Sequence, residues 1–383
     1  MPHHGNRKRI KALHVTENAT VEELVERLGA SSYQARTLAE ACRIFEEMLK
    51  RGSAVCLTLA GAMTPAGIGG YIADMIRRGF IDIVITTGAN ATHDTHFPLD
   101  TPITQGNPDS DDVELREEGI ERVYDTYLDP SCLTALGEAL YREFLPNWKR
   151  ERETSSPAFY RELGKFLAAK AKPELRDTSF LIAASEFDVP VFTPAFGDSE
   201  IGMDCALFEL DNPGKAPVVN PNLDVLELTA LVFAAEKTGV IAVGGGSPKN
   251  FFTQTAPLLE EDIYMPDAMT GHEGHDYIIK ITTDVPEYGG CSGATPSENI
   301  SWKKLDPSIL GTGEIVVHAD ATIALPVLFH YVTSRVKPRE PKRLFTKIPE
   351  ARRKLEEARV ARRKRFGQKS YRIGVELDIE KNT

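Results

Sequence analysis

Long apolar runs are missing from this sequence of 383 residues, because no stretch approaches the roughly 20 apolar residues that a transmembrane helix needs. The first residues, MPHHGNRKRIKALHV, carry basic side chains, but no apolar segment of signal-peptide length follows them. We therefore expect a soluble protein of the cytoplasm that has no membrane partner.

Cysteine pairs and repeats are missing as well. The five cysteines are scattered and form no Cys-x-x-Cys pair, so neither a disulfide framework nor a zinc site is expected. Two histidines in HEGHD, residues 272–276, are three positions apart but have no third ligand nearby, and we interpret this segment as a polar loop. No motif recurs at a fixed period, which argues against a solenoid.

Basic side chains are too few to balance the acidic ones. The sequence has 45 Lys and Arg against 56 Asp and Glu, and its formal net charge is −11. This balance argues against nucleic acid as a partner. It is compatible with a cationic substrate, although solubility alone is the commoner reason for such a charge.

The sequence shows two patterns of apolar residues, one in its N-terminal part and another downstream. Apolar positions recur at helical spacing over residues 20–50, and Thr20 with Glu23 forms a Thr-x-x-Glu start, so we expect two helices that are separated near residues 29–32. Downstream, helical stretches alternate with the β-rich runs SAVCLTLA, IDIVITT, VPVFTPA, VIAV and EIVVHA. This alternation predicts an α/β fold: a Rossmann-like, doubly wound, mostly parallel sheet with helices on both faces, preceded by a helical N-terminal element.

Small residues follow each of these runs, at the carboxyl ends of the expected strands. Ligands of doubly wound sheets bind at these ends, near the point where the strand order reverses. Glycines let the backbone approach a ligand closely, and the helix that follows offers free N–H groups to a phosphate. These features make a dinucleotide the natural candidate. A tight strand-to-helix turn is the commoner explanation of any one glycine run taken alone, and GGGSPKN, residues 244–250, is the run that it explains least easily. The spacing is not the GxGxxG of an ordinary Rossmann dehydrogenase.

Three further side chains are candidates for chemistry. Asp320 follows EIVVHA, where its carboxylate either binds ribose hydroxyls or an adenine edge, or caps the next helix. Lys303 and Lys304 follow Trp302, and a lysine becomes a nucleophile only if burial or a neighbouring cation lowers its pKa. Trp302 and Lys303 are placed to supply both effects to Lys304. A Lys-Lys pair is more often part of a solvated loop, and spacing alone does not decide between the two.

The run ENISWKK, residues 298–304, resembles the active-site segment of the deoxyhypusine synthases: Glu, two residues, Ser-Trp, one residue and the catalytic lysine. Between about residues 52 and 335, further similar segments follow in the family's order: LTLAGAMTPAG, DIVITTGAN, VPVFTPAFGDSEIG, TGVIAVGGGSPKN, DYIIKITTD and VHADA. We therefore expect a helical N-terminal element (1–50), an NAD-binding deoxyhypusine-synthase-like domain (51–335) and a basic, partly helical C-terminal extension (336–383). That extension is expected to be a solvated helix that packs on the body or on a neighbouring subunit, and contact with an acidic partner or nucleic acid is the less favoured alternative.

This resemblance implies an NAD-dependent transferase of the 4-aminobutyl group of spermidine. Hydride transfer to NAD oxidises spermidine, 1,3-diaminopropane leaves, and the active-site lysine captures the butylimine. An acceptor amine then takes up the group, and NADH reduces the product. The acceptor is a lysine of translation factor 5A in deoxyhypusine synthases and putrescine in homospermidine-forming relatives. A homotetramer with sites at a subunit interface is also implied.

The resemblance assigns roles position by position. Lys304 is the expected nucleophile, Trp302 is expected to stack on the polyamine methylenes, and Glu298 is expected to pair with an ammonium group. The residues expected at the NAD site are Thr87, Gly88, Asp198, Gly244, Gly245, Gly246, Thr283, Asp284, Asp320 and Ala321.

Departures from the family's pattern fall on the substrate side. Asn250 replaces the histidine after the glycine run, and Cys291 replaces an aspartate that holds an ammonium group. Asp204 matches a second polyamine-binding aspartate only across a one-residue gap. His93 stands where the family has an acidic residue, and it is either the proton acceptor that replaces the missing histidine or a loop or helix-cap residue. These changes predict that the acceptor differs from that of the eukaryotic enzyme. They leave open whether the donor differs too.

Two other functions remain open. An NAD-dependent amine dehydrogenase would leave Lys304 a structural role, and a polyamine-binding protein would have lost turnover. A transferase retains its NADH and forms a larger amine, a dehydrogenase accumulates free NADH, and a binding protein does neither.

Overall fold

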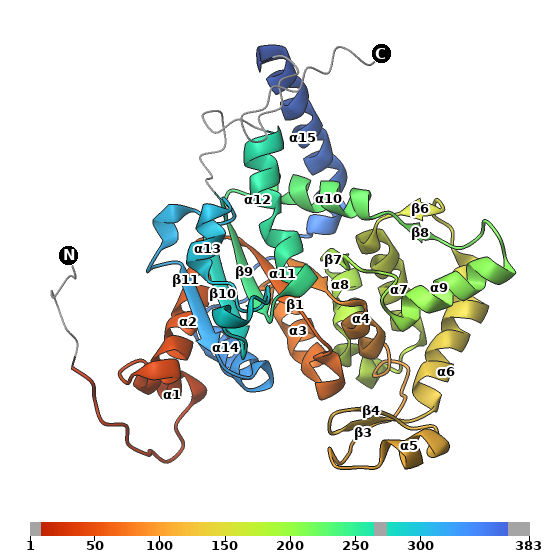
Figure 1. Ribbon diagram of the computed structural model, residues 1–383, viewed down its shortest axis with the longest axis horizontal. Helices are drawn as coiled ribbons and strands as arrows, with labels where there is room; N and C mark the ends of the chain where they lie inside the picture. The colour runs from red at the N-terminus through yellow and green to blue at the C-terminus, as the bar shows by residue number, and fades with distance from the viewer. Residues whose placement is uncertain (1–8, 264–273, 367–383) are drawn as a thin grey trace.

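A parallel sheet forms the centre of the computed structural model, which describes residues 9–263 and 274–366 (Figure 1). Each pairing between its six strands is parallel. Across the sheet, the order is β11 (Glu314–His318), β10 (Tyr277–Thr282), β9 (Thr238–Val243), β1 (Ala54–Leu59), β2 (Ile83–Thr86) and β7 (Val191–Phe192). Sequence order therefore runs outward in both directions from the β1–β9 pair, which confirms the predicted doubly wound fold.

Both faces of this sheet are buried. In β1, the side chains of Val55, Leu57 and Leu59 belong to the core on one face, and Cys56 belongs to the core on the other. Successive side chains of a strand point to opposite faces, so a strand covered on both sides needs a continuous apolar run. Each residue of β1 and β9 is buried, as this rule requires of central strands.

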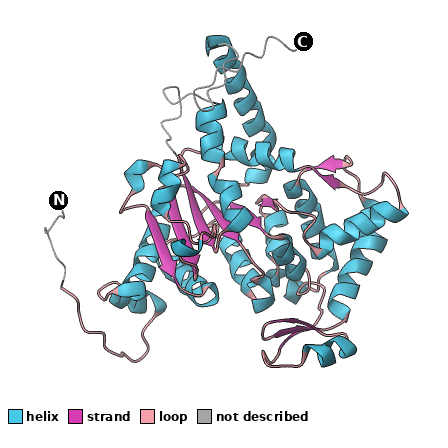
Figure 2. Ribbon diagram, viewed as in Figure 1, coloured by secondary structure: helices cyan, strands magenta, loops and turns pink. Residues whose placement is uncertain are grey.

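Helices cover each face (Figure 2). The core of Val55 is completed by α2 (Tyr33–Lys50), α3 (Ile68–Arg77) and α14 (Ala321–Arg335). The core of Cys56 is completed by α10 (Pro221–Ala234), α11 (Gly246–Thr253) and α15 (Leu344–Phe366). The basic C-terminal stretch thus packs on the body through Ile348, Ala351 and Leu355. No helix within the described ranges is long and apolar enough to cross a membrane.

The N-terminal helices form as expected. A capping box between Thr20 and Glu23 starts α1 (Val21–Leu28), in which each residue's side chain accepts a hydrogen bond from the other's backbone N–H. The expected break separates α1 from α2. This element is continuous with the body, because Phe45 and Met48 of α2 lie in the same core as the sheet.

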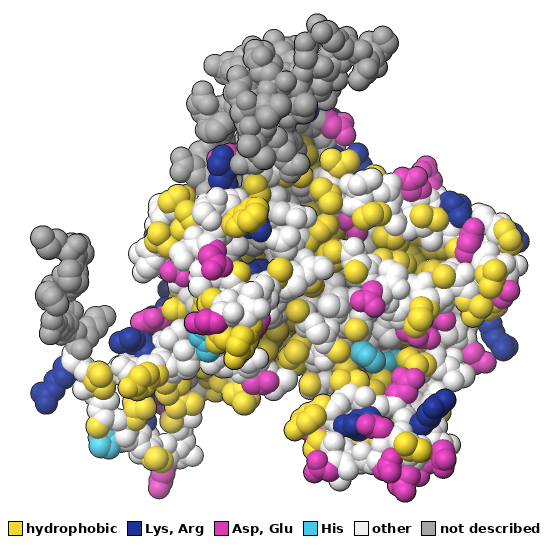
Figure 3. Space-filling model, in the orientation of Figure 1, with side chains coloured by type: hydrophobic (Ala, Val, Ile, Leu, Met, Phe, Trp, Pro, Cys, Tyr) yellow, Lys and Arg dark blue, Asp and Glu magenta, His cyan; other side chains and the backbone are white. Residues whose placement is uncertain are grey.

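Between β2 and β7 the chain makes a long excursion that the strand pattern did not reveal. A small antiparallel sheet in it has the order β3-β5-β4, with three residues in each strand. Such strands are too short for an alternation to be recognised. Acidic side chains gather over this part of the molecule (Figure 3). The elements of the excursion are α4 (Gly88–Asp94), β3 (Ile103–Gln105), α5 (Asp112–Glu118), β4 (Glu121–Val123), β5 (Thr126–Leu128), α6 (Ser131–Glu138), β6 (Glu153–Thr154), α7 (Ser156–Lys170) and α8 (Phe180–Glu186).

Four further elements lie in the chain between β7 and β11. Strand β8 pairs with β6 in a two-stranded parallel ribbon. These elements are α9 (Glu200–Asp211), β8 (Val218–Val219), α12 (Thr255–Pro257) and α13 (Pro296–Ser301).

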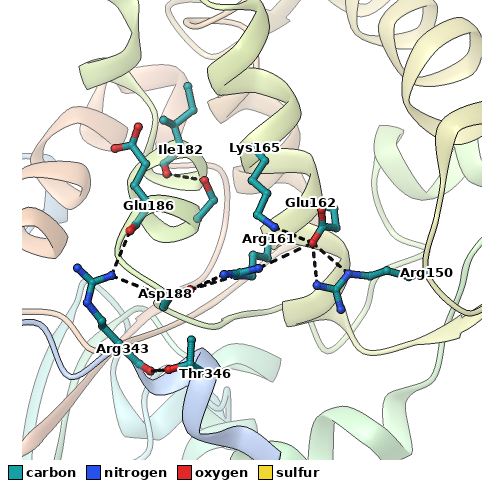
Figure 4. Close-up of polar contacts among 10 residues, drawn as sticks. Arg150, Arg161, Glu162, Lys165, Ile182, Glu186, Asp188, Arg343 and Thr346 are labelled. Atoms are coloured by element: carbon teal, nitrogen blue, oxygen red, sulfur yellow. Dashed lines mark hydrogen bonds and ion pairs between the residues drawn. The ribbon is translucent and has the colours of Figure 1, made fainter.

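Ion pairs fasten the segment between α14 and α15 to the body. The guanidinium of Arg339 lies 3.0 Å from the Asp82 carboxylate, whose side chain is 1% exposed at the amino end of β2. Arg339 also donates to the carbonyls of Gly79 and Ser53. Farther along, the carboxylate of Asp188 lies between the guanidinium groups of Arg161 and Arg343 (Figure 4).

Removing the Arg339 side chain should leave a buried carboxylate without its counter-ion. We expect Arg339→Ala to lower the free energy of unfolding by about 3 kcal/mol, measured by urea denaturation. The exposed pair of Arg353 and Glu357 supplies the matched control, and Arg353→Ala should cost no more than about 0.5 kcal/mol. Equal losses in the two variants would contradict the structural role of Arg339.

Candidate active site

A cleft of about 360 Å³ opens at the carboxyl ends of β1, β9, β10 and β11. It lies where the strand order reverses, the position at which doubly wound sheets bind ligands. Most of the residues expected at an NAD site line it: Gly244, Gly245, Gly246, Thr283, Asp284, Asp320 and Ala321.

The glycine run gives this cleft a wall of bare backbone. Gly244 and Gly246 have φ angles of +69° and +58°, which side chains rarely adopt. A Cβ on Gly245 would lie 2.4 Å from the Cα of Ser292, which also lines the cleft. Each of the three positions therefore has its own reason to be glycine, and the sequence pattern alone did not separate them.

The structure shows the capping role considered for Asp320 and places this residue at the cleft. Its Oδ1 accepts a hydrogen bond from the backbone N–H of Thr322 at 2.8 Å and caps α14, while the residue also lines the cleft. A carboxylate at the end of β11 is thereby fixed beside the glycine wall.

The other expected cofactor residues stand beside the cleft. Thr87 caps α4, and its hydroxyl donates to the carbonyl of Gly61, a cleft residue, at 2.6 Å. A Cβ on Gly88 would lie 2.9 Å from the carbonyl oxygen of Asp198. Thr87, Gly88 and Asp198 thus form one group at the end of β2.

Lys304 lies in a second, larger cavity of about 680 Å³, which it lines together with Trp302 and Asn250. The other described residues that line it are Val225, Thr229, Phe251, Gln254, Thr255, Pro257, Leu258 and Ser301. Apolar side chains and uncharged polar groups therefore surround the amine.

A left-handed turn directs Lys304 into this cavity. After α13 the chain reaches Lys303, whose φ of +55° is unusual for a residue with a side chain. The Lys303 amine lies 3.4 Å from a carboxylate oxygen of Glu260, on the π-helical turn Leu258–Ile263. The backbone N–H of Lys304 then donates to the carbonyl of Asn299 at 2.9 Å. The two adjacent lysines thus have different environments, a distinction that the sequence did not show.

The Lys304 amine is held from two sides. It donates to Oδ1 of Asn250 at 2.6 Å, and it lies 5.4 Å from the ring centroid of Trp302. Burial lowers the pKa of this amine, which favours the neutral, nucleophilic form. Burial is the main cause of this lowered pKa. The other expected cause, the neighbouring Lys303 cation, is paired with Glu260 instead.

Two buried lysines near this site were missed from the sequence. Lys249 of α11 is 3% exposed and donates to the carbonyl of Cys291 at 2.6 Å. Lys280 of β10 is 1% exposed and donates to the carbonyl of Ala294. They anchor the loop between β10 and α13, and burial lowers the pKa of both amines, that of Lys280 to about 8. A lysine inside the apolar run YIIKIT is unusual, and this could have indicated from the sequence that Lys280 is buried.

The expected substrate residues are only partly gathered. Glu298 lies on α13, one turn before Trp302, and its carboxylate accepts from the backbone N–H of Thr295 at 3.0 Å. Cys291 is exposed on the anchored loop. Asp204 is buried on α9, where burial, and after it Glu200, raises its pKa to about 6. Within the described residues, Asp204 does not line the Lys304 cavity.

His93 also lies apart from the described lining of that cavity. On α4, its Nδ1 lies 3.2 Å from Nε2 of His96. Burial lowers the pKa of both imidazoles, and that of His96 falls to about 4. The shift at His93 favours the neutral imidazole, the form that accepts a proton.

The expectation of a polar loop at HEGHD is wrong for His275, which is fully buried. Its ring stacks on Phe252 with 4.2 Å between centroids, and its Nδ1 lies 2.9 Å from the Thr238 hydroxyl. The backbone of His275 also forms a bridge to Leu305, next to Lys304, so the residue is held against the folded body on both sides. His272 lies outside the described residues, and within those ranges no three His, Cys, Asp or Glu residues form a group suited to a metal ion.

The fold and this site define a Rossmann-like α/β protein with a cleft at the switch point and a half-buried lysine in a neighbouring cavity. The family model of deoxyhypusine synthase matches residues 23–332. A deoxyhypusine synthase-like protein of Nostoc punctiforme is 38% identical over 340 residues, which cover 87% of this chain and 85% of the relative. A protein of Methanosarcina mazei named probable deoxyhypusine synthase 1 is 37% identical over 333 residues, which cover 86% and 96%.

A solved structure agrees in fold. The crystal structure of a proposed deoxyhypusine synthase from Entamoeba histolytica superposes with a TM-score of 0.54 and 16% sequence identity, over 86% of this chain and 99% of that one. The chain belongs to the deoxyhypusine synthase family, a family of transferases.

The buried amine of Lys280 should make stability depend on alkaline pH. Its pKa falls from 10.5 to about 8 on folding, so between these pH values the unfolded chain binds more protons, and stability rises with pH. We expect wild type to gain up to about 3 kcal/mol over Lys280→Met between pH 8 and pH 10.5, measured by urea denaturation. The control is Lys215→Met, at an exposed lysine, whose free energy of unfolding should differ from that of wild type by the same amount at each pH. A difference that is independent of pH for Lys280→Met as well would contradict the lowered pKa of Lys280.

Proposed function

We propose that this protein transfers the 4-aminobutyl group of spermidine, with NAD as cofactor, through an imine on Lys304 to an acceptor amine. The observation that carries this proposal is the half-buried Lys304 amine, whose lowered pKa suits a nucleophile, in a cavity near the glycine-walled cleft. Membership in a family of transferases supports the same chemistry.

The cleft suits NAD in its donor groups. Bare backbone at Gly244, Gly245 and Gly246 allows a phosphate to approach, and the Asp320 carboxylate offers an acceptor for ribose hydroxyls. NAD, when bound, would accept a hydride from the donor amine and later return it. The chain's own contribution is to bind and orient it.

Lys304 would carry the aminobutyl group between donor and acceptor. Its neutral amine attacks the imine carbon of oxidised spermidine, a new C–N bond forms, and 1,3-diaminopropane leaves with a proton. The acceptor amine then attacks the same carbon and releases Lys304. Trp302 would face the methylene chain, and Glu298 would pair with a terminal ammonium group.

The acceptor is a small amine such as putrescine or a lysine of translation factor 5A. Asn250, Cys291 and Asp204 belong to the substrate side of the proposal, together with His93 as proton acceptor. Asp204 and His93 lie outside the described Lys304 cavity of their own chain, which is compatible with a site completed by a second copy in a homotetramer. An amine dehydrogenase and a polyamine-binding protein are the alternatives that the test must separate.

Mass spectrometry of the amines formed from spermidine and NAD, with and without putrescine, tests this proposal. We expect 1,3-diaminopropane and homospermidine with wild type and with the surface variant Lys172→Ala, and neither product with Lys304→Ala. Free NADH without a larger amine would identify a dehydrogenase instead. If wild type binds spermidine but yields neither product, including with translation factor 5A as acceptor, the protein binds polyamines without turnover.

His93 is tested by the same assay. Loss of a proton acceptor typically lowers turnover by a factor of about 100 or more, and we expect this of His93→Ala at pH 7. The exposed His330 supplies the control, since His330→Ala removes a histidine outside the proposed site. Full activity of His93→Ala would remove this residue from the mechanism.

A further inference from the structure

Asn250 stands between the proposed nucleophile and a second amide. The Lys304 amine donates to Oδ1 of Asn250 at 2.6 Å, and Nδ2 of Asn250 donates to Oε1 of Gln254 at 3.2 Å. Asn250 lies within α11 and Gln254 is its C-cap residue, four positions later, so the two side chains share one helix face. All three side chains line the same cavity.

Both contacts require the same orientation of the Asn250 amide. An amide has one end that accepts and one end that donates, whereas a lysine amine in its charged form only donates. If the amide were flipped, its NH₂ would face the Lys304 ammonium, and two donors would oppose each other. In this orientation the NH₂ end of Asn250 points away from the amine and donates to Oε1 of Gln254.

An amide at this position does something that an acid or a base would not do. Its oxygen accepts a hydrogen bond from either the charged or the neutral amine, but it takes up no proton near neutral pH. It adds no negative charge, whereas a carboxylate at this distance would stabilise the ammonium form of Lys304. The contact therefore directs the amine while it leaves the neutral form accessible.

The other charged groups that the structure describes around Lys304 make contacts of their own. Lys249 on α11 points to the carbonyl of Cys291, and the thiol of Cys291 acts on Lys304 only as a secondary influence. Glu298 on α13 is engaged with Thr295, and Glu260 is paired with Lys303. Asn250 is the side chain whose polar atom meets the Lys304 amine in the described contacts.

We propose that Asn250 and Gln254 form an uncharged amide pair that positions the Lys304 amine toward the cavity. Asn250 acts on the amine directly, and Gln254 acts through Asn250. This inference deepens the proposed function, because it concerns the same nucleophile. It assigns Asn250 a positioning role in addition to the substrate contact expected from its place in the sequence.

Competitive reductive methylation with formaldehyde and cyanoborohydride, read by mass spectrometry, tests the contact on the full-length protein without spermidine or NAD. Measured from pH 6 to pH 11, it gives an apparent pKa for each lysine. Asn250→Asp should raise that of Lys304 by about 1 to 3 units, because a carboxylate replaces the amide. Asn222→Asp, at an exposed position at the start of α10, should leave it unchanged. An unchanged value in Asn250→Asp would overturn the contact.

Measurement of kcat then shows whether Asn250 directs the Lys304 amine or acts only on its pKa. Asn250→Leu should leave the pKa of Lys304 equal or lower, yet reduce kcat at least tenfold, because the amine is no longer directed. Gln254→Leu should reduce kcat less, and Gln254→Glu should restore it, since a carboxylate also accepts from Nδ2 of Asn250. Wild-type levels of kcat in both leucine variants would overturn the positioning role.

The two assays fail separately. If wild type shows no aminobutyl transfer while Asn250→Asp still shifts the Lys304 titration, the proposed function fails and the contact stands. In each variant, methylation of the exposed Lys172 and the far-UV circular dichroism spectrum report whether the fold is intact. If Asn250→Leu does not fold, the Gln254→Leu and Gln254→Glu pair decides the positioning role.

Discussion

The reversal of strand order between β1 and β9 is the constraint on which the rest of the molecule depends. Parallel strands are joined by crossovers, and the chain leaves β1 toward the face of α3 but leaves β9 toward the face of α11. The two connections diverge, and the space between them is the cleft. Because backbone forms one wall of this space, side chains at residues 244–246 would fill it or strain it, so the glycine run follows from topology as much as from any ligand.

Strands with long apolar runs were predictable from the sequence, and short ones were not. The six-residue strands β1 and β9 are buried along their whole length, and their composition reveals them. The antiparallel strands of residues 103–128 have three residues each, and no local signal separates them from loop. They are held by their pairing with one another and by contacts such as the ion pair of Arg122 in β4 with Asp112 in α5, which a single sequence does not show.

Some features of the site were likewise predictable from the sequence and others were not. The motif from Glu298 to Lys304 identified the lysine and its tryptophan, because spacing along the chain carries that information. It did not reveal that Lys303 turns away to Glu260, since a left-handed φ at a lysine has no signature in sequence. Lys249 and Lys280 escaped notice for a related reason: lysines are rarely buried, and only the folded chain brings carbonyl groups to their amines.

The ion pair of Asp82 and Arg339 also has a consequence for how the chain is made. The two residues are 257 positions apart, so on a ribosome the strand β2 is synthesised long before the counter-ion at its amino end. Contacts of such sequence separation form late, and they slow folding. An N-terminal fragment that contains β1, β2 and the excursion after them would therefore lack the guanidinium that pairs with the Asp82 carboxylate. The native surroundings of β2 are in this respect complete only once synthesis has passed Arg339.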